Sequence, residues 1–278
     1  MILSILILLI PIVSAIEMNL NCISMNYKVD TKKQYSLSEV KTMCNQAHQF
    51  YKENSWGKFI FDTDSYICDC PLNGNKGNVY KCEKICINEY NKKHPGRSKN
   101  SKYAIVNRYN TFSNAGKNIA HINRINPYRT VFHELSHSLG LHHSGAYNGN
   151  KYEEYGDKLS VMGKFPSNYF ASPQYKFLGF IEDKQIENYL DNKQFYNLTR
   201  LVSNDKENIK IIIVKLSGRD MYISFPQACD KCIALHLSED GSGTALVNKF
   251  SNKYYDKYSN KTYEIIGITN NILNLSIK

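Results

Sequence analysis

Two histidines and a glutamate lie at a spacing that suits metal chemistry. His133 and His137 are four residues apart, so on a helix they lie one turn apart on the same face and both imidazoles can reach a single ion. Glu134 directly follows the first histidine. Gly140 can take the left-handed conformation that ends a helix and turns the chain, and His143 then adds a third imidazole. The spacing predicts a metal site on these three histidines.

The predicted ligands are those of a catalytic zinc. Three neutral imidazoles leave one coordination position open to water, whereas a structural site uses four protein ligands. Zinc lowers the pKa of water and polarises a carbonyl, and Glu134 can take the proton from that water. We therefore expect one catalytic Zn2+ on His133, His137 and His143, and peptide hydrolysis in which Glu134 passes the proton to the leaving amine. The adjacent His142 is expected to face solvent or to lie behind the ligands.

A helix is expected to present these residues. Asn126 is a favourable N-cap, and Pro127 suits the first helical position. Val131, Leu135 and Leu139 recur at intervals of four residues, which gives the helix an apolar face to bury. The helix should therefore begin near residue 126 and end at the glycine turn.

The full pattern, H-E-x-x-H-x-x-G-x-x-H, resembles that of the metzincin metallopeptidases. Met162 lies nineteen residues after His143, where that clan has the methionine of its Met-turn beneath the metal. Within the clan the chain resembles the gametolysin family, the algal cell-wall lysins. The segments that carry this resemblance are HELSHSLGLHHSG (133–145), YGDKLSVMG (155–163) and ASPQYKFLGFI (171–181).

The resemblance implies an α+β fold with a metzincin-like catalytic domain. A mixed sheet and a backing helix would pack over the active-site helix, and the third histidine and the Met-turn would lie in a lower subdomain. The resemblance also implies a secreted zinc endopeptidase. Its extended polypeptide substrate would add to an edge strand within 103–122, and extracellular or cell-wall glycoproteins are its substrate class by analogy.

Two residues near the predicted Met-turn are informative. Lys164 stands two positions after Met162, where some metzincins carry a tyrosine ligand, so no tyrosine ligand is expected from that position. Asp157 either fixes the turn through hydrogen bonds or is an ordinary surface carboxylate.

The chain is expected to consist of a signal peptide and two domains. Residues 1–15 form an apolar run that ends in V-S-A, which is typical of a secretory signal cleaved after Ala15 and too short to span a membrane. From about residue 195 onward, short β-rich runs such as CIALHL alternate with polar turns. We therefore expect a metzincin-like catalytic domain over 16–190 and a β-rich C-terminal domain over 191–278.

The supporting elements are predicted from periodicity and turn residues. Ser36 or Ser38 can cap the first helix. The predicted elements are a helix over 36–54, strands over 57–64, 103–109 and 117–122, and a basic surface loop over 92–102.

All eight cysteines follow the predicted signal peptide, which favours disulfides formed in an oxidising compartment. Cys229 and Cys232 form a C-x-x-C pair in a β-rich region, so a structural disulfide is expected there and not a redox pair. The four cysteines of 68–86 could hold a second, structural zinc, although disulfides are favoured. The sequence does not decide which cysteines pair with each other.

A secreted or lumenal location fits other features. Sequons begin at Asn197, Asn260 and Asn274, so a glycoprotein is expected. The net charge is +10, but the lysines are scattered and no nucleic-acid motif accompanies them. We therefore expect a solvated basic surface, no nucleic-acid partner and no membrane span.

Two other functions compete with the peptidase prediction. A secreted binding or adhesion protein could keep a metallopeptidase scaffold without turnover, but the chain has all three ligands and Glu134. A purely structural zinc site would need a fourth protein ligand, and it would not explain the glutamate.

Overall fold

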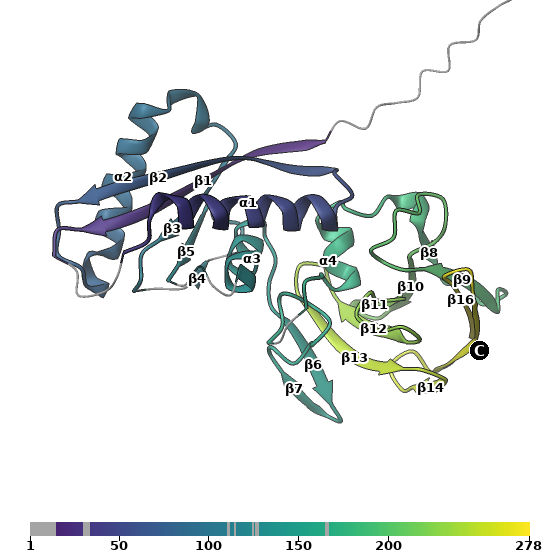
Figure 1. Ribbon diagram of the computed structural model, residues 1–278. Helices are drawn as coiled ribbons and strands as arrows, with labels where there is room; N and C mark the ends of the chain where they lie inside the picture. The colour runs from purple at the N-terminus through teal and green to yellow at the C-terminus, as the bar shows by residue number, and fades with distance from the viewer. Residues whose placement is uncertain are drawn as a thin grey trace, which may run out of the picture.

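The computed structural model describes residues 15–29, 34–109, 112–113, 115–123, 125, 128–164 and 167–278. Apart from Ala15, the predicted signal peptide lies outside the described residues, as do Asn126 and Pro127. Over the described residues the chain is a mixed α/β structure with three sheets and few helices (Figure 1). No helix among them is both long and apolar enough to cross a membrane.

The first sheet belongs to the N-terminal half and has the strand order β2-β1-β3-β5-β4. Its neighbours run parallel except for the β4–β5 pair, so the predicted mixed sheet is confirmed. Strand β1 is buried on both faces, as is typical of parallel strands: Leu20 and Cys22 pack in one core, and Ile23 and Met25 in another. The strands are β1 (Ile16–Tyr27), β2 (Phe59–Cys70), β3 (Ser101–Val106), β4 (Phe112–Ser113) and β5 (Ile119–Ile122).

Helix α1 (Leu37–Asn54) backs this sheet, which confirms the helix predicted over 36–54 (Figure 1). Ser36 and Glu39 form a capping box, so Ser36 is the N-cap. The hydroxyl of Tyr51 donates to the carbonyl of Phe132, 3.1 Å away, on the helix that carries the predicted metal ligands. The backing helix is therefore tied directly to the predicted site.

The eight cysteines form four disulfides, which confirms the disulfide prediction. Two of them join β2 to helix α2 (Val79–Lys93), which packs with Ile23 and Met25 of β1. The cysteines of 68–86 are thus engaged with each other, and the alternative of a structural zinc there is wrong. The four bonds are Cys22–Cys44, Cys68–Cys86, Cys70–Cys82 and Cys229–Cys232.

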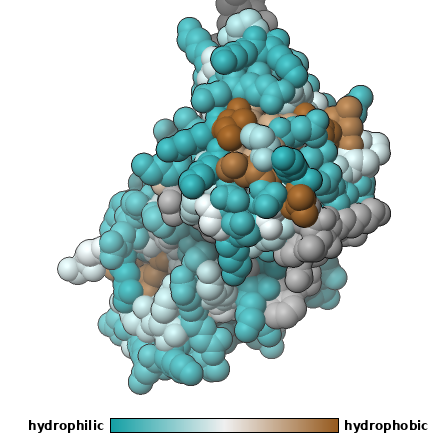
Figure 2. Space-filling model, turned by 90° about the vertical axis from the view of Figure 1, so that its left-hand side faces the viewer, coloured by the Kyte–Doolittle hydropathy of each residue, from teal (hydrophilic) through white to brown (hydrophobic). Residues whose placement is uncertain are grey.

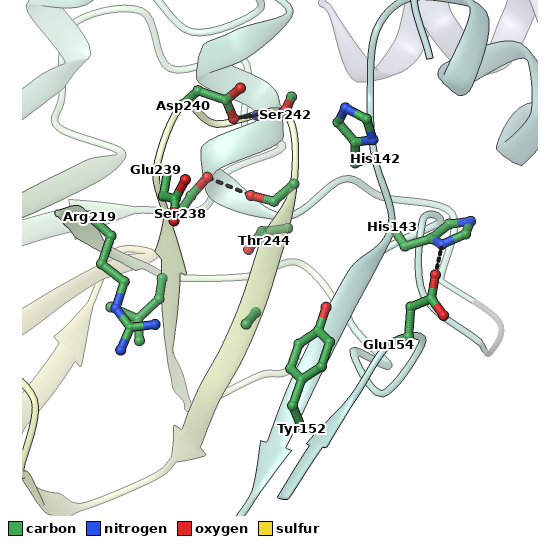
Figure 3. Close-up of a pocket in the computed structure, with 13 residues that line it drawn as sticks. His142, His143, Tyr152, Glu154, Arg219, Ser238, Glu239, Asp240, Ser242 and Thr244 are labelled. Atoms are coloured by element: carbon green, nitrogen blue, oxygen red, sulfur yellow. Dashed lines mark hydrogen bonds and ion pairs between the residues drawn. The ribbon is translucent and has the colours of Figure 1, made fainter. Parts of the chain in front are cut away.

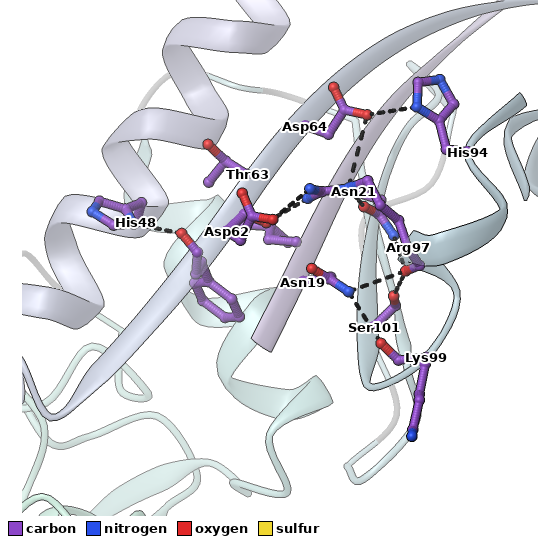
Figure 4. A network of polar contacts seen from close by, with 12 residues as sticks. Asn19, Asn21, His48, Asp62, Thr63, Asp64, His94, Arg97, Lys99 and Ser101 are labelled. Carbon is purple, nitrogen blue, oxygen red and sulfur yellow. Dashed lines mark hydrogen bonds and ion pairs between the residues drawn. The ribbon is translucent and has the colours of Figure 1, made fainter. Parts of the chain in front are cut away.

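The basic segment over 92–102 is anchored on the sheet and is not a free loop (Figure 4). It holds the end of α2 and a short 3-10 helix, η2 (Pro95–Arg97). The guanidinium of Arg97 donates to Asp62 of β2, at 2.6 Å, and to Asn21 of β1, at 3.1 Å. One side chain thus holds the segment against two strands.

The C-terminal part is β-rich, as predicted from about residue 195 onward. A seven-stranded sheet, β7-β6-β13-β12-β11-β10-β8, shares a hydrophobic core with a four-stranded sheet, β14-β15-β16-β9. The strands after residue 185 are β8 (Ile186–Asn188), β9 (Phe195–Thr199), β10 (Ile211–Leu216), β11 (Arg219–Ser224), β12 (Ile233–Ser238), β13 (Thr244–Phe250), β14 (Lys253–Asp256), β15 (Lys261–Thr269) and β16 (Ile272–Ile277).

The seven-stranded sheet includes two strands from the predicted catalytic half. Strands β6 (Ser144–Asn148) and β7 (Lys151–Glu153) form a hairpin, and β6 pairs in parallel with β13. In addition, Ile211 of β10 packs in the same core as Leu135 and Met162. The division of the chain at residue 190 stays a prediction. The remaining helices are α3 (Tyr128–Ser138), α4 (Ser172–Phe177), η1 (Lys76–Asn78) and η3 (Asp183–Gln185).

The surface is largely polar where Figure 2 views it. That face is mostly hydrophilic, with a small group of hydrophobic side chains in its upper half.

Candidate metal centre

Helix α3 carries three of the four predicted functional side chains. Val131 and Leu135 are fully buried and hold one face of the helix in the core beneath the first sheet. This burial leaves His133, Glu134 and His137 along one side of the helix, with His133 and His137 one turn apart. The predicted apolar periodicity is therefore what orients the site.

The helix ends at the predicted glycine turn. Gly140 has φ of +100°, in the left-handed region that favours glycine. The N–H of Gly140 donates to the carbonyl of His137 at 2.9 Å, and the N–H of Leu141 donates to Ser136 at 3.1 Å. The reversal brings His143 back toward the helix.

The three predicted histidines come together. One nitrogen of each ring of His133, His137 and His143 lies within 4.8 Å of the others, a spacing that could hold a metal ion. The Nε2 atoms of His137 and His143 are 3.1 Å apart. The ring centroids of His133 and His137 are 4.8 Å apart. The centroid of the His143 ring lies 5.4 Å from that of His133 and 4.8 Å from that of His137.

Each histidine is oriented through its other ring nitrogen. The Nδ1 atom of His133 lies 2.9 Å from the carbonyl oxygen of Val161. The Nδ1 atom of His137 lies 2.6 Å from the carbonyl oxygen of Leu141. The Nδ1 atom of His143 lies 2.6 Å from the carboxylate of Glu154. Since a carbonyl or carboxylate oxygen only accepts, Nδ1 carries the proton in each ring. The lone pair of Nε2 is then free for a metal, as in other histidine metal sites.

Burial keeps the helical histidines neutral. It lowers the pKa of His133 to about 4 and also lowers the pKa of His137, because the imidazolium form loses its hydration. The backbone carbonyls that accept from Nδ1 oppose this shift without reversing it. Neutral imidazole is the form that binds metal, so both rings are ready to do so at neutral pH.

Glu134 has the environment of a general base. Burial raises the pKa of its carboxyl to about 7, while a hydrogen bond from the backbone N–H of Ser113 opposes this increase. Its Oε2 atom is buried and has no hydrogen-bond partner in the described part of the chain. An orphaned buried acceptor is costly, and one on the residue that follows His133 fits a role toward a water at the metal. The residues present therefore fit a zinc site.

A tight turn that includes Met162 and Gly163 follows the third histidine along the chain. Met162 is fully buried and packs in the same core as Leu135 and Leu141 of the metal-site segment. A Cβ on Gly163 would lie 1.8 Å from the carbonyl oxygen of Asp157, so only glycine fits there. The identification of this turn as a Met-turn stays a prediction.

Asp157 fixes this turn, and its interpretation as a surface carboxylate is wrong. It is fully buried and accepts hydrogen bonds from the Ser144 hydroxyl at 2.6 Å and the Leu159 N–H at 2.7 Å. Its Oδ2 also lies 3.2 Å from Nε2 of His236 in β12. The turn is thus linked both to the residue after the third histidine and to the C-terminal sheet.

Three residues near the site were not predicted from the sequence. Glu154 contacts His143, and the ring of Tyr155 lies 4.0 Å from the ring of His143. Arg129 donates to the backbone carbonyl of Gly163 at 2.8 Å. None belongs to the histidine motif, and only Tyr155 lies in a segment that carries the family resemblance. His142 is exposed, as was expected.

A cavity of about 480 Å3 opens beside the third histidine (Figure 3). His143 and Glu154 line it on one side, and the turn between β12 and β13 lines it on the other. Strand β4 is the edge strand of the first sheet, and its Ser113 contacts Glu134. The site therefore contacts a sheet edge through Glu134 and a side pocket through His143.

Comparison with known proteins adds a distant likeness. No family model matches the chain, and no curated protein matches it in sequence. Wild-type OgpA from Akkermansia muciniphila is 13% identical with a TM-score of 0.39, covering 86% of this chain and 95% of that chain. Catalytically inactive OgpA in complex with an O-glycopeptide (glycodrosocin) substrate is 12% identical with a TM-score of 0.38, covering 95% and 94%.

A chain from a chaperone–substrate complex is also similar, with 13% identity and a TM-score of 0.39. The match covers 58% of this chain and 30% of that one, so it spans less than a third of the larger chain. Likenesses at this level carry no argument about activity. The functional inference rests on the residues of the site.

Proposed function

We propose that the chain is a zinc-dependent endopeptidase whose ligands are His133, His137 and His143. The observation that carries the proposal is the convergence of one nitrogen from each of three imidazoles, on rings whose Nδ1 atoms are hydrogen bonded to acceptors. A structural zinc would require a fourth protein ligand, and no such group joins this cluster among the described residues. The buried carboxylate of Glu134 beside the cluster further supports a catalytic role.

Glu134 is the proposed general base. When zinc is bound it lowers the pKa of water and polarises the scissile carbonyl. Glu134 accepts the proton of the attacking water through its free Oε2 and then delivers it to the leaving amine nitrogen. Burial raises the pKa of this carboxyl in the metal-free chain, which favours its holding a proton between the two transfers.

The proposal includes a metzincin-like, gametolysin-like catalytic domain over 16–190 and a β-rich domain over 191–278. The mixed sheet, the backing helix and the buried Met162 support this assignment. An extended substrate would add to β4, the edge strand that contacts Glu134. The four disulfides are typical of an oxidising compartment, and we propose that the protein is secreted and acts on extracellular glycoproteins.

The test uses the chain from residue 16 onward, produced through a secretory pathway so that its disulfides form. Bound zinc is measured by elemental analysis, and cleavage of a protein mixture is followed with and without a chelator. We expect about one zinc per chain and chelator-sensitive cleavage. The Glu134→Ala variant should keep its zinc and lose activity by about 100-fold or more.

Two outcomes would contradict this proposal. Full zinc occupancy without any cleavage would favour a binding or adhesion protein that keeps a metallopeptidase scaffold. Cleavage that persists undiminished in Glu134→Ala would remove the proposed base. The Glu153→Gln variant, which alters an exposed carboxylate on β7, is the matched control and should behave as the parent chain.

A further inference from the structure

The cavity beside His143 is built by two segments that are far apart in the sequence. Tyr152 and Glu154 come from the β6–β7 hairpin, and residues 238–245 come from the end of β12, the turn after it and the start of β13 (Figure 3). Its volume of about 480 Å3 is ample for a large side chain of a bound peptide. Neither helix α3 nor residues 155–163 line the cavity, so the C-terminal sheet provides much of its wall.

The cavity wall is rigidly joined to the third histidine. The N–H of His142 donates to the carbonyl of Ser242 at 3.0 Å, and the N–H of Thr244 donates to the carbonyl of His143 at 3.4 Å. Beyond this point β13 continues in register with β6, with Thr244 opposite Ser144. A group bound in the cavity is therefore held at a fixed position relative to the metal centre.

Two glycines lie next to residues that line the cavity. A Cβ on Gly145 would lie 2.4 Å from the ring of Tyr152, so the ring lies directly over a glycine. A Cβ on Gly243 would lie 3.4 Å from the Cβ of His142, an ordinary van der Waals distance, so the two segments lie close together there. The Tyr152 ring is 48% exposed and lines the cavity.

The charge of the cavity is opposite to that of the chain. Glu154, Glu239 and Asp240 line it against a single cation, Arg219, whereas the whole chain has a net charge of +10. The guanidinium of Arg219 lies 5.4 Å from the centroid of the Tyr258 ring, and the carboxylate of Glu239 is exposed. The cavity therefore attracts positive charge, with Glu239 available to contact it.

A buried hydroxyl also points to a ligand. Thr244 lines the cavity and is only 5% exposed, yet its Oγ1 atom has no hydrogen-bond partner in the described part of the chain. Leaving such a group unpaired costs free energy, which a bound donor would recover. Nearby, Asp240 accepts from both the hydroxyl and the N–H of Ser242, which lowers the pKa of its carboxyl and keeps it ionised.

We propose that this cavity is a specificity subsite that takes a lysine or arginine side chain of the peptide substrate. The proposal rests on the proposed peptidase function and assigns a role to the C-terminal sheet in it. The cationic head would contact Glu239 and donate to Thr244 Oγ1, while its aliphatic stem would lie along the ring of Tyr152. Carboxylates together with an exposed aromatic ring are the groups that bind such cations best.

The test is a cleavage profile of the zinc-loaded chain. A peptide library derived from a whole proteome is digested, and the residues around each new cut are identified by mass spectrometry, with Glu134→Ala as the blank. We expect lysine and arginine to be enriched at one position next to the cut. Two peptides that differ only at this position, with lysine or glutamine there, are then compared. Glu239→Gln should lower the ratio of kcat/KM for the lysine peptide to kcat/KM for the glutamine peptide by about fivefold to tenfold.

Two further variants sharpen the result. Glu239→Lys should shift the preference toward aspartate and glutamate, and Glu207→Gln, an exposed carboxylate outside the cavity, should leave the profile unchanged. Zinc-dependent cleavage with no basic preference, or with a preference for glycosylated residues at that position, would overturn the subsite and leave the peptidase function standing. Absence of any cleavage beyond the blank would overturn both.

Discussion

The three site histidines are oriented by acceptors of two kinds. His133 and His137 contact backbone carbonyls, whereas His143 contacts the carboxylate of Glu154. A carboxylate partner makes the imidazole a stronger metal ligand than a carbonyl does. His143 also lies beyond the helix and depends more on a side chain for its position. The third ligand is therefore the one most sensitive to its neighbour.

Removing this carboxylate should weaken zinc binding. We expect Glu154→Gln to raise the dissociation constant for zinc by about 10-fold or more, because an outer partner of a metal ligand typically contributes 10–100-fold. Competition with a chromogenic chelator at pH 7 measures this constant. Glu153→Gln removes the adjacent exposed carboxylate and should leave the constant unchanged. Equal constants for Glu154→Gln and the parent chain would mean that Glu154 does not orient the ligand.

The pH dependence of activity follows from the protonation of Glu134. Burial raises the pKa of this carboxyl to about 7, and the positive charge of bound zinc would lower it again. The base must be ionised to accept a proton, so kcat/KM should fall as the pH decreases, with a midpoint between about 4.5 and 7. Initial rates from pH 4 to 9 test this. A profile that rises toward acid would contradict the assignment of the base.

The sequence allowed the four central residues to be predicted but not their neighbours. His133, Glu134, His137 and His143 lie within eleven residues, where helix geometry and one glycine turn decide their relative positions. Glu154 reaches the site through a hairpin whose course depends on pairing with β13, about one hundred residues later. Non-local pairing of this kind leaves no local pattern in a single sequence.

At the scale of elements, the turn that contains Met162 and Gly163 is held by one buried acid, Asp157. Asp157 connects this turn to Ser144 of β6 and to His236 of β12. Both partners are fully or almost fully buried, so no solvent is available to replace the lost contacts. Three elements therefore depend on a single carboxylate.

Replacing this acid should destabilise the fold. We expect Asp157→Ala to lower the free energy of unfolding by about 3–5 kcal/mol. This is the usual cost when a buried charged group is removed and its polar partners stay buried without it. Urea unfolding followed by tryptophan fluorescence measures it, since Trp56 is the only tryptophan. Asp230→Ala is the control, because this side chain is fully exposed and its loss should change stability by less than about 0.5 kcal/mol. A similar change in both variants would show that the network contributes little.

Local patterns predicted some elements and missed others. The helix over 36–54 has a capping box and a clear apolar face, and it was found within one residue. Strand β1 is buried on both faces and contains several asparagines, so it lacks the alternation that identifies a half-buried strand. Helix α2 was not predicted, because the cysteines of 68–86 indicated disulfides and gave no sign of the element that carries two of them.

At the scale of the whole molecule, the metal centre and the C-terminal sheet share structure. Ile211, Ile213 and Tyr222 of β10 and β11 pack in the core that contains Leu135 and Met162. Strand β6, which follows the third ligand directly, has β13 as a neighbour. The predicted boundary at residue 190 therefore crosses both a hydrophobic core and a sheet.

A chain that ends at residue 190 should consequently fail to form the site. Each fully buried apolar side chain contributes about 1.5–3 kcal/mol, so losing three from the shared core removes an amount similar to the total stability of a typical domain. We expect residues 16–190 to unfold without cooperativity, to bind a hydrophobic dye, and to bind zinc at least 10-fold more weakly than residues 16–278. Thermal unfolding and chelator competition on both chains measure this. Cooperative unfolding of the shorter chain with the zinc affinity of the longer one would show instead that the two predicted domains fold independently.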